Sequence, residues 1–91
     1  MRVFFHKKFD KAFKRLKTAE QEKFLQRIEL FRRDEFNPIL SNHPLKGKYK
    51  GLRSINVTGD LRAIYESKGD LAIFVMIDIH SNLYGLFNST I

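Results

Sequence analysis

The sequence predicts a single domain of the α+β class, residues 1–91, in which a helical hairpin packs on an antiparallel sheet. Three observations support this prediction. The chain has only 91 residues, a length that supports one compact hydrophobic core. Its first third carries two stretches with the apolar spacing of amphipathic helices. The remainder carries short β-type runs separated by turn residues, so the expected order of elements is β-α-α-β-β-β.

The N-terminal elements follow from residue type and spacing. Residues 3–5 are β-branched and aromatic, which predicts a short first strand. The next apolar residues recur at i, i+3, i+4 and i+7, the stripe of a first helix. This stripe consists of Phe9, Ala12, Phe13 and Leu16.

A second helix is expected to begin at a capping box formed by Thr18 and Gln21. It should end before Pro38, because proline disfavours helical geometry at the residue before it. Its expected apolar face consists of Phe24, Leu25, Ile28 and Phe31. The two helices should therefore form a hairpin with a tight turn at residues 17–19.

The C-terminal half reads as a loop followed by three strands. Residues 41–51 are rich in turn formers and cations, which predicts a loop. Residues 52–57 and 61–66 are strand candidates, and the residues between them are typical of a hairpin turn. Residues 71–77 are apolar on both faces, as expected of a strand inside the sheet.

Composition limits the classes of function. Seventeen Lys and Arg against ten Asp and Glu give a net charge of +7 and a pI near 9.9, which indicates a polyanionic partner such as nucleic acid or an acidic protein. The cations of the two helices are interpreted as an ordinary solvated surface. The chain has no cysteine, so disulfides, thiolate zinc sites and cysteine nucleophiles are excluded. A cytoplasmic protein is expected, because the longest apolar run, residues 71–77, is too short to span a membrane.

Two of the three histidines are candidate catalytic residues. His6 ends a strand and is interpreted as structural. His43 lies in the loop, His80 follows the last strand and Asp60 lies at the intervening hairpin, so the three residues can converge at one edge of a meander. Two imidazoles and a carboxylate beside cations suit metal-free RNA cleavage, in which one group deprotonates the ribose 2′-OH and another protonates the leaving 5′ oxygen. No metal or cofactor is expected.

Several cations and aromatic residues are candidate contacts to RNA. In an extended segment, Lys46, Lys48 and Lys50 would share one face at roughly the phosphate repeat of a single strand. A solvated edge strand is the alternative interpretation, and the pattern does not decide between them. The other candidates are cations on the following strands and tyrosines that could stack on bases or pack in the core. They are Arg53, Arg62, Tyr49 and Tyr84.

Two segments carry a resemblance to a known family. The run HPLKGKYKGLRSINVTGDLRAIY (residues 43–65) and the later IHSNLYG (residues 79–85) resemble the RelE/ParE superfamily of type II toxins, and within it the YafQ-like branch. The resemblance implies a RelE-like fold and a toxin that enters the ribosome, cleaves mRNA and is neutralised by a cognate acidic antitoxin. It further implies that the toxin-antitoxin complex binds operator DNA through the antitoxin. By position, His43, Asp60 and His80 match catalytic residues, and Tyr84 matches a family aromatic residue.

The chain departs from the family pattern at two places. Asn56 stands where family members have a further histidine, and an amide does not titrate. The Gly-Thr pair that usually precedes the second histidine is missing before His80. Three hypotheses therefore follow: a ribosome-dependent endoribonuclease, a weakened relative that retains antitoxin binding, and a gyrase inhibitor of the ParE type.

Overall fold

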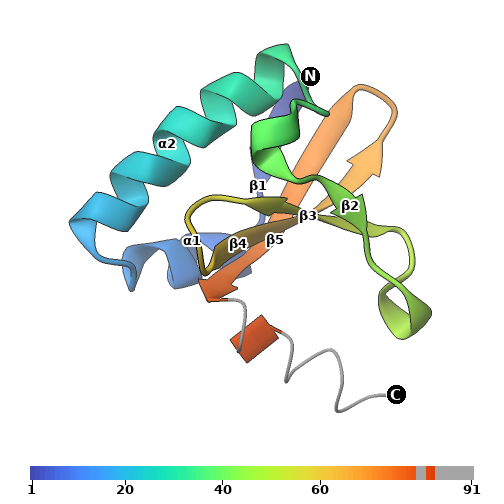
Figure 1. The fold of residues 1–91 in the computed structure, drawn as a ribbon. Coiled ribbons are helices and arrows are strands. Elements are labelled where there is room, and N and C mark those ends of the chain that lie inside the picture. The colour runs from blue at the N-terminus through green and yellow to red at the C-terminus, as the bar shows by residue number, and fades with distance from the viewer. Residues whose placement is uncertain (80–81, 84–91) are drawn as a thin grey trace.

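The computed structural model describes residues 1–79 and 82–83, and the remaining residues are drawn as a grey trace in Figure 1. The predicted order of helices and strands is confirmed, with one additional short strand. The elements are β1 (Arg2–Phe5), α1 (Lys7–Lys14), α2 (Thr18–Arg33), the 3-10 helix η1 (Pro38–Leu40), β2 (His43–Pro44), the 3-10 helix η2 (Gly47–Tyr49), β3 (Leu52–Asn56), β4 (Leu61–Lys68) and β5 (Leu71–Ile79). No helix in the described part of the chain is long and apolar enough to cross a membrane.

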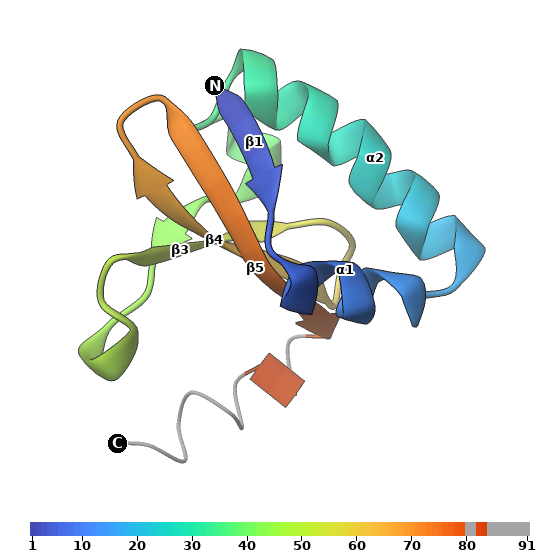
Figure 2. The same ribbon diagram turned by 180° about the vertical axis from the view of Figure 1, so that it is seen from behind.

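The sheet is mixed, which corrects the prediction of an antiparallel sheet. Its strand order is β1-β5-β4-β3-β2. The pairs β2–β3, β3–β4 and β4–β5 are antiparallel, whereas β1 runs parallel to β5, with Arg2 opposite Leu71 and Phe5 opposite Phe74. Figure 2 shows β1 beside the first half of β5. Two helices separate β1 from the meander, and a connection of this length permits the parallel pairing that a tight hairpin forbids.

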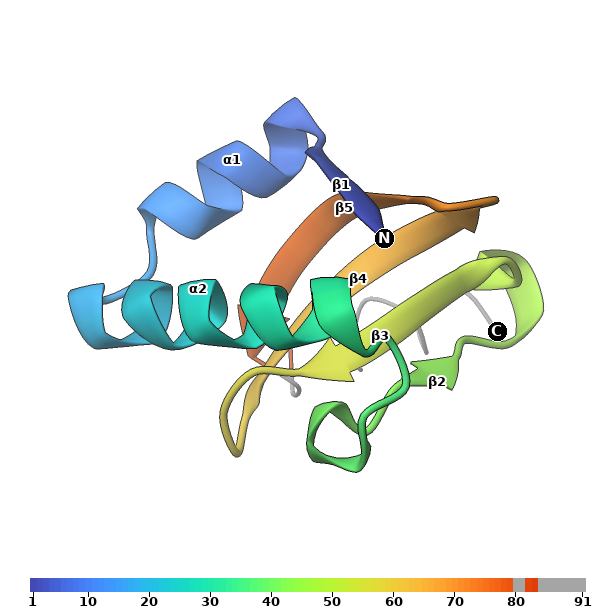
Figure 3. The ribbon, with the colours of Figure 1, turned by 90° about the horizontal axis from the view of Figure 1, so that it is seen from above.

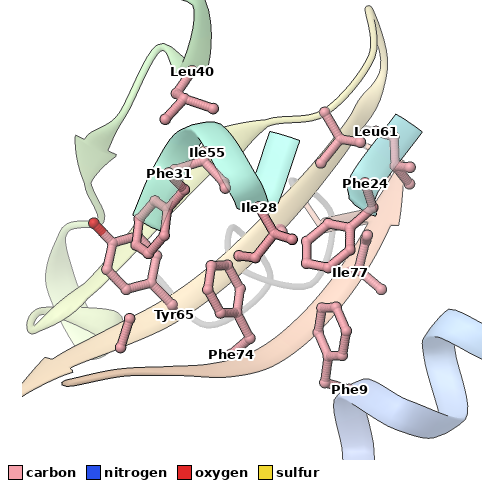
Figure 4. Packing of buried hydrophobic residues seen from close by; sticks show 13 residues of the cluster. Phe9, Phe24, Ile28, Phe31, Leu40, Ile55, Leu61, Tyr65, Phe74 and Ile77 are labelled. Carbon is pink, nitrogen blue, oxygen red and sulfur yellow. The ribbon is translucent and has the colours of Figure 1, made fainter. Parts of the chain in front are cut away.

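Both helices pack on the same face of the sheet (Figure 3). The rings of Phe9 from α1 and of Phe24 and Phe31 from α2 all contact Phe74 of β5, at centroid distances of 5.3–5.9 Å. Figure 4 shows these side chains together with Tyr65 of β4 between the helices and the strands. One apolar core therefore joins both helices to the two central strands. We call the opposite face of the sheet the far face.

The cap of α2 differs from the predicted capping box. The N-cap is Lys17, and its backbone N–H donates to the Glu20 carboxylate at 3.0 Å. Gln21 instead donates through Nε2 to the carbonyl oxygens of Phe13 and Leu16, at 2.9 and 3.4 Å. These carbonyls lie at the end of α1 and beyond it, where helical partners run out. Gln21 thus closes the end of α1, and Glu20, one residue earlier, caps α2.

A bulge in β5 changes which residues face the core. Ile64 of β4 pairs with Met76, but the next residue, Tyr65, pairs with Phe74, so Val75 has no partner in β4. A bulge of this kind shifts the alternation of side chains by one residue. Phe74 and Ile77 consequently both belong to the core. After the bulge, Met76 and Asp78 lie on the far face.

Candidate functional site

The pairing of strands collects polar residues on the far face. His43 of β2 lies opposite Ser54 of β3, and Ser54 lies opposite Ile64 of β4. Ile64 and Ser54 are buried but lie outside the core cluster between helices and sheet. Directly opposite residues in antiparallel strands share a face. Arg62 lies two residues before Ile64 on β4 and therefore on the same face, so the meander brings the predicted residues His43 and Arg62 to one face of the sheet.

Arg62 is the centre of this polar cluster. Its Nε donates to the Ser54 hydroxyl at 2.5 Å, and its Nη2 donates to the Ser41 carbonyl at 3.0 Å. The same Nη2 lies 3.3 Å from His43 Nδ1. Arg62 is half-buried, and this burial lowers the pKa of its guanidinium. An arginine remains charged at neutral pH even so, and the cluster therefore presents a fixed cation beside an imidazole.

Two contacts of Nδ1 bear on the tautomer of His43. His43 is exposed, and its Nδ1 lies 3.0 Å from the carbonyl oxygen of Ser41 and 3.3 Å from Arg62 Nη2. A carbonyl only accepts and favours a proton on Nδ1, whereas a guanidinium only donates and favours the other tautomer; the contact with Ser41 is the shorter of the two. With the proton on Nδ1, Nε2 is the unprotonated nitrogen of the neutral ring. Ser41 has a left-handed backbone with φ of 44°, and its carbonyl accepts from both His43 and Arg62. The arrangement can supply a base and a cation a few ångströms apart.

A second row of polar residues lies next to this cluster. Asn56 of β3 is opposite Arg62, and Arg62 is opposite Asp78 of β5. Asn56 is half-buried, and its buried Oδ1 has no hydrogen-bond partner among the described residues. Asp78 Oδ1 accepts from the backbone N–H of Ile79 at 2.7 Å and from Asn82 Nδ2 at 3.1 Å. Asp78 therefore fixes the direction of the chain at the end of β5.

The other predicted catalytic residues are placed only in part. Asp60 lies exposed in the turn between β3 and β4, where it makes no hydrogen bond or ion pair to any described residue. Asp60 is therefore not joined to the cluster of His43 and Arg62. His80 and Tyr84 lie outside the described residues. Within residues 1–79 and 82–83, no three His, Cys, Asp or Glu side chains come together in a way that could hold a metal ion.

The three lysines of the loop do not form the extended ladder that the spacing predicts. Residues 47–49 form the 3-10 helix η2, and Gly47 and Gly51 take positive φ values of 64° and 102°. In an extended chain every second residue lies on the same face, so the three lysines would be aligned. A 3-10 helix turns the chain and directs these side chains apart. Lys46, Lys48 and Lys50 are exposed, and Tyr49 is half-buried. The loop thus presents its cations in several directions.

Arg53 lies on the helix-covered face, away from His43. It is opposite the core residue Tyr65, whereas the adjacent Ser54 belongs to the far face. Its Nε donates to Asn42 Oδ1 at 2.8 Å, and its guanidinium lies 5.1 Å from the centre of the Phe36 ring. A guanidinium over an aromatic face is a favourable cation–π arrangement. The structure therefore separates the two candidate arginines, Arg53 and Arg62, by the thickness of the sheet.

Sequence reasoning missed three residues of this region. Ser54 and Ser41 bind Arg62, and Asn42 binds Arg53. Alternation gave no signal for Ser54, because it neighbours the core residue Ile55 and so stands at a position of β3 where the pattern predicts an outward side chain. No local pattern identifies Ser41 or Asn42, since their roles depend on strands that lie farther along the chain.

Comparison with solved structures first defines the class of fold. YafQ from E. coli strain BL21(DE3) matches with a TM-score of 0.71 and 24% identity over 93% of this chain and 100% of that chain. A YoeB/ParE toxin from Agrobacterium tumefaciens matches with a TM-score of 0.72 and 21% identity over 88% and 99% of the two chains. A chain of the E. coli DinJ–YafQ complex matches with a TM-score of 0.69 and 26% identity over 93% and 100%. The fold is that of RelE-type toxins.

Comparison with family models identifies the branch. The model described as a bacterial toxin of a type II toxin-antitoxin system, YafQ, matches residues 1–85. The chain therefore belongs to the YafQ family of toxins. A search of curated protein sequences finds no match.

Proposed function

We propose that this toxin is an endoribonuclease that cleaves mRNA on the ribosome by acid–base catalysis without a metal. The observation that carries the proposal is the cluster of His43, Arg62, Ser41 and Ser54 on the far face. It pairs an exposed imidazole with a guanidinium held by hydrogen bonds to neutral oxygens, and no carboxylate of the described residues forms an ion pair with this cation. A phosphate needs such a free positive charge. Family membership supports the same reaction class.

The chemistry assigns roles to the residues of the cluster. RNA cleavage of this type forms a bond from the ribose 2′ oxygen to phosphorus and breaks the bond from phosphorus to the 5′ oxygen. His43 Nε2 exchanges a proton with one of these oxygens, and Arg62 stabilises the negative charge of the phosphorane. His80 is proposed as the complementary acid or base, with Asp60 orienting it and Tyr84 stacking on a base. Lys46, Lys48, Lys50 and Tyr49 are proposed as contacts to RNA, while Arg53 acts through packing.

Replacement of His43 tests the proposal. His43→Gln and Arg62→Gln should each lower the rate of cleavage of a translated message by about 100- to 10,000-fold, measured by primer extension and by relief of growth arrest. The matched control is His6→Asn. His6 caps α1 by accepting from the Lys8 backbone N–H at 3.1 Å, and asparagine is also a good N-cap. Full cleavage by His43→Gln would show that His43 is not catalytic.

A weakened enzyme is the second candidate function, and one observation favours it. Asn56 lies directly opposite Arg62 and its amide cannot exchange protons. If this position limits the reaction, Asn56→His should raise the cleavage rate and add a titration to its pH profile. A wild-type protein that cuts no RNA but binds its antitoxin would establish the weakened form.

An acidic antitoxin is the proposed partner, as in the E. coli DinJ–YafQ toxin-antitoxin complex. A groove of about 390 Å³ between α1 and the end of β5 supports it. Its lining includes the apolar side chains of Leu16 and Met76, and it carries three cations, Lys8, Lys11 and Arg15, against one acidic residue, Asp78. These three cations make no ion pair with the described residues. A lining that is partly apolar and mainly cationic suits an acidic, partly apolar peptide.

The partner is tested with the product of the neighbouring reading frame. Lys8→Glu/Lys11→Glu should weaken its binding about tenfold or more and flatten the salt dependence. Lys7→Glu/Lys14→Glu changes the charge of the same helix equally, but neither residue lines the groove, so binding should change less. Equal effects of the two variants would favour net charge over this groove.

A further inference from the structure

A polar network on the helix-covered side of the sheet holds the chain immediately before His43. Asn42 uses both ends of its amide. Its Nδ2 donates to the Glu35 carbonyl at 3.0 Å and to the Tyr65 hydroxyl at 2.7 Å, and its Oδ1 accepts from Arg53 Nε at 2.8 Å. We call these four residues the Asn42 anchor. Three short hydrogen bonds to three different segments fix the side chain of Asn42 in one position.

The phenol of Tyr65 makes the anchor rigid. Its hydroxyl donates to Glu35 Oε2 at 2.7 Å, and the side chain is fully buried in the core, where its ring lies 4.9 Å from that of Phe31. Burial, with a contribution from Glu35, raises the pKa of Tyr65 to about 12. The phenol therefore stays neutral and remains a donor at physiological pH. The anchor is tied in this way to the buried core.

Within the anchor, Asn42 lies between Ser41 and His43, whose contact favours one tautomer of the His43 ring. Ser41, on one side of Asn42, supplies the carbonyl that accepts from His43 Nδ1 at 3.0 Å. His43, on the other side, begins β2, which is only two residues long. A two-residue strand pairs too weakly to fix its own position. The side chain of Asn42 therefore helps to fix the backbone of residues 41–43, together with the hydrogen bond from Arg62 Nη2 to the Ser41 carbonyl.

We propose that Asn42 is a positioning residue that holds the Ser41 carbonyl against His43 Nδ1 and so keeps His43 Nε2 free to exchange protons. The expected effect on catalysis rests on the proposed ribonuclease function. The expected effect on the tautomer of His43 does not depend on it. Asn42 acts from the face opposite to the reaction and touches neither His43 Nδ1 nor Arg62. Its loss should leave the reacting groups present but misaligned.

The first measurement determines which nitrogen of the His43 imidazole carries the proton. Nitrogen-15 NMR of the free toxin, at a pH where His43 is neutral, should show a proton on Nδ1 in the wild type and a mixture of tautomers in Asn42→Ala. The matched control is Asn37→Ala. Asn37 lies in the same segment but bonds only within it, to Asp34 at 3.1 Å and to the Ile39 N–H at 3.0 Å. Asn37→Ala should keep the Nδ1 proton.

The second measurement separates positioning from binding. In ribosome-dependent cleavage of a translated message, Asn42→Ala should lower kcat about 10- to 100-fold with little change in KM, because small misplacements of a reacting group reduce the rate at this scale. Asn42→Asp keeps the acceptor for Arg53 Nε but loses the two donations of Nδ2, to the Glu35 carbonyl and to the Tyr65 hydroxyl, so it should recover at most part of kcat and of the Nδ1 tautomer. Thermal unfolding verifies that each variant is folded at the assay temperature.

The outcomes distinguish this inference from the proposed function. An Asn42→Ala protein that is less stable but retains the Nδ1 tautomer would show that the anchor is only structural, and would overturn the inference. A wild-type protein that cuts no RNA would overturn the ribonuclease function, while the tautomer measurement would still decide whether Asn42 positions His43.

Discussion

Phe74 is the residue on which the packing of helices against the sheet depends most. Its side chain is fully buried, and its ring contacts five other aromatic rings, at centroid distances of 5.2–5.9 Å. These rings come from β1, α1, α2 and β4. Phe74→Ala therefore removes a side chain that contacts rings from all four elements, and leaves a cavity that their different backbones cannot close together.

The expected loss of stability follows from this geometry. Replacing a buried phenylalanine by alanine typically costs about 3–5 kcal/mol, and the edge-to-face contacts with Phe24 and Phe31 favour the upper part of that range. A domain of this size has a total stability of about 5–14 kcal/mol. Phe74→Ala should accordingly lower Tm by roughly 15–30 °C.

Urea unfolding followed by circular dichroism measures this loss. The matched control is Phe4→Ala on the neighbouring strand, because Phe4 is 58% exposed and its removal should cost less than about 1 kcal/mol. The slope of free energy against urea should remain close to that of the wild type. A cost for Phe74→Ala below about 1.5 kcal/mol would refute the argument that this ring joins the four elements.

Three further predictions concern titration and backbone strain. The raised pKa of Tyr65, about 12, means that the unfolded state loses this proton first as the pH rises above about 10, so stability should fall there; Tyr65→Phe should remove that fall in urea midpoints measured from pH 9 to 11.5. The hydrogen bond from Arg2 lowers the pKa of the Asp70 carboxyl below its usual value. This pair therefore stabilises the fold above about pH 4, and the stabilisation is lost as the pH falls through the pKa of the folded state. Asp70→Asn should make the unfolding midpoint less dependent on pH between 6 and 2, by a small amount because both groups are exposed. Gly69 has a φ of 62°, so Gly69→Ala should cost about 1 kcal/mol in thermal unfolding, whereas Gly59→Ala, at a position with equal space and no left-handed φ, should be neutral or slightly stabilising.

Periodicity was sufficient to predict the helices and the three long strands, because each buries one continuous apolar face. The parallel position of β1 was not predictable, since residues 2–5 carry no mark of their partner in β5. The bulge at Val75 was equally hidden, because an apolar run such as residues 71–77 fits either phase of alternation. The local sequence pattern was therefore enough to predict the helices and strands, but not which strands pair with each other or where the bulge lies.

The candidate site was predictable only where residue type alone carried the signal. His43 and Arg62 were candidates for their chemistry, and the structure brings them within 3.3 Å of each other. The extended geometry of the lysine ladder was wrong, because the 3-10 helix at Gly47–Tyr49 turns the chain between Lys46 and Lys50. Asn42 could not be identified from the sequence, since its hydrogen-bond partners lie after the end of α2 and on the strands β3 and β4.

The parallel pairing of β1 with β5 has a consequence for the order of folding. Arg2 and its partner Asp70 are 68 positions apart in the chain, whereas β3, β4 and β5 are joined by short turns. Closing so large a loop is entropically expensive and slow, and chains rich in such distant contacts fold slowly. The meander can assemble early, but β1 must wait for β5 to be formed. During synthesis the first strand is therefore an unpaired edge, open to other chains, until nearly the whole described sequence has been made.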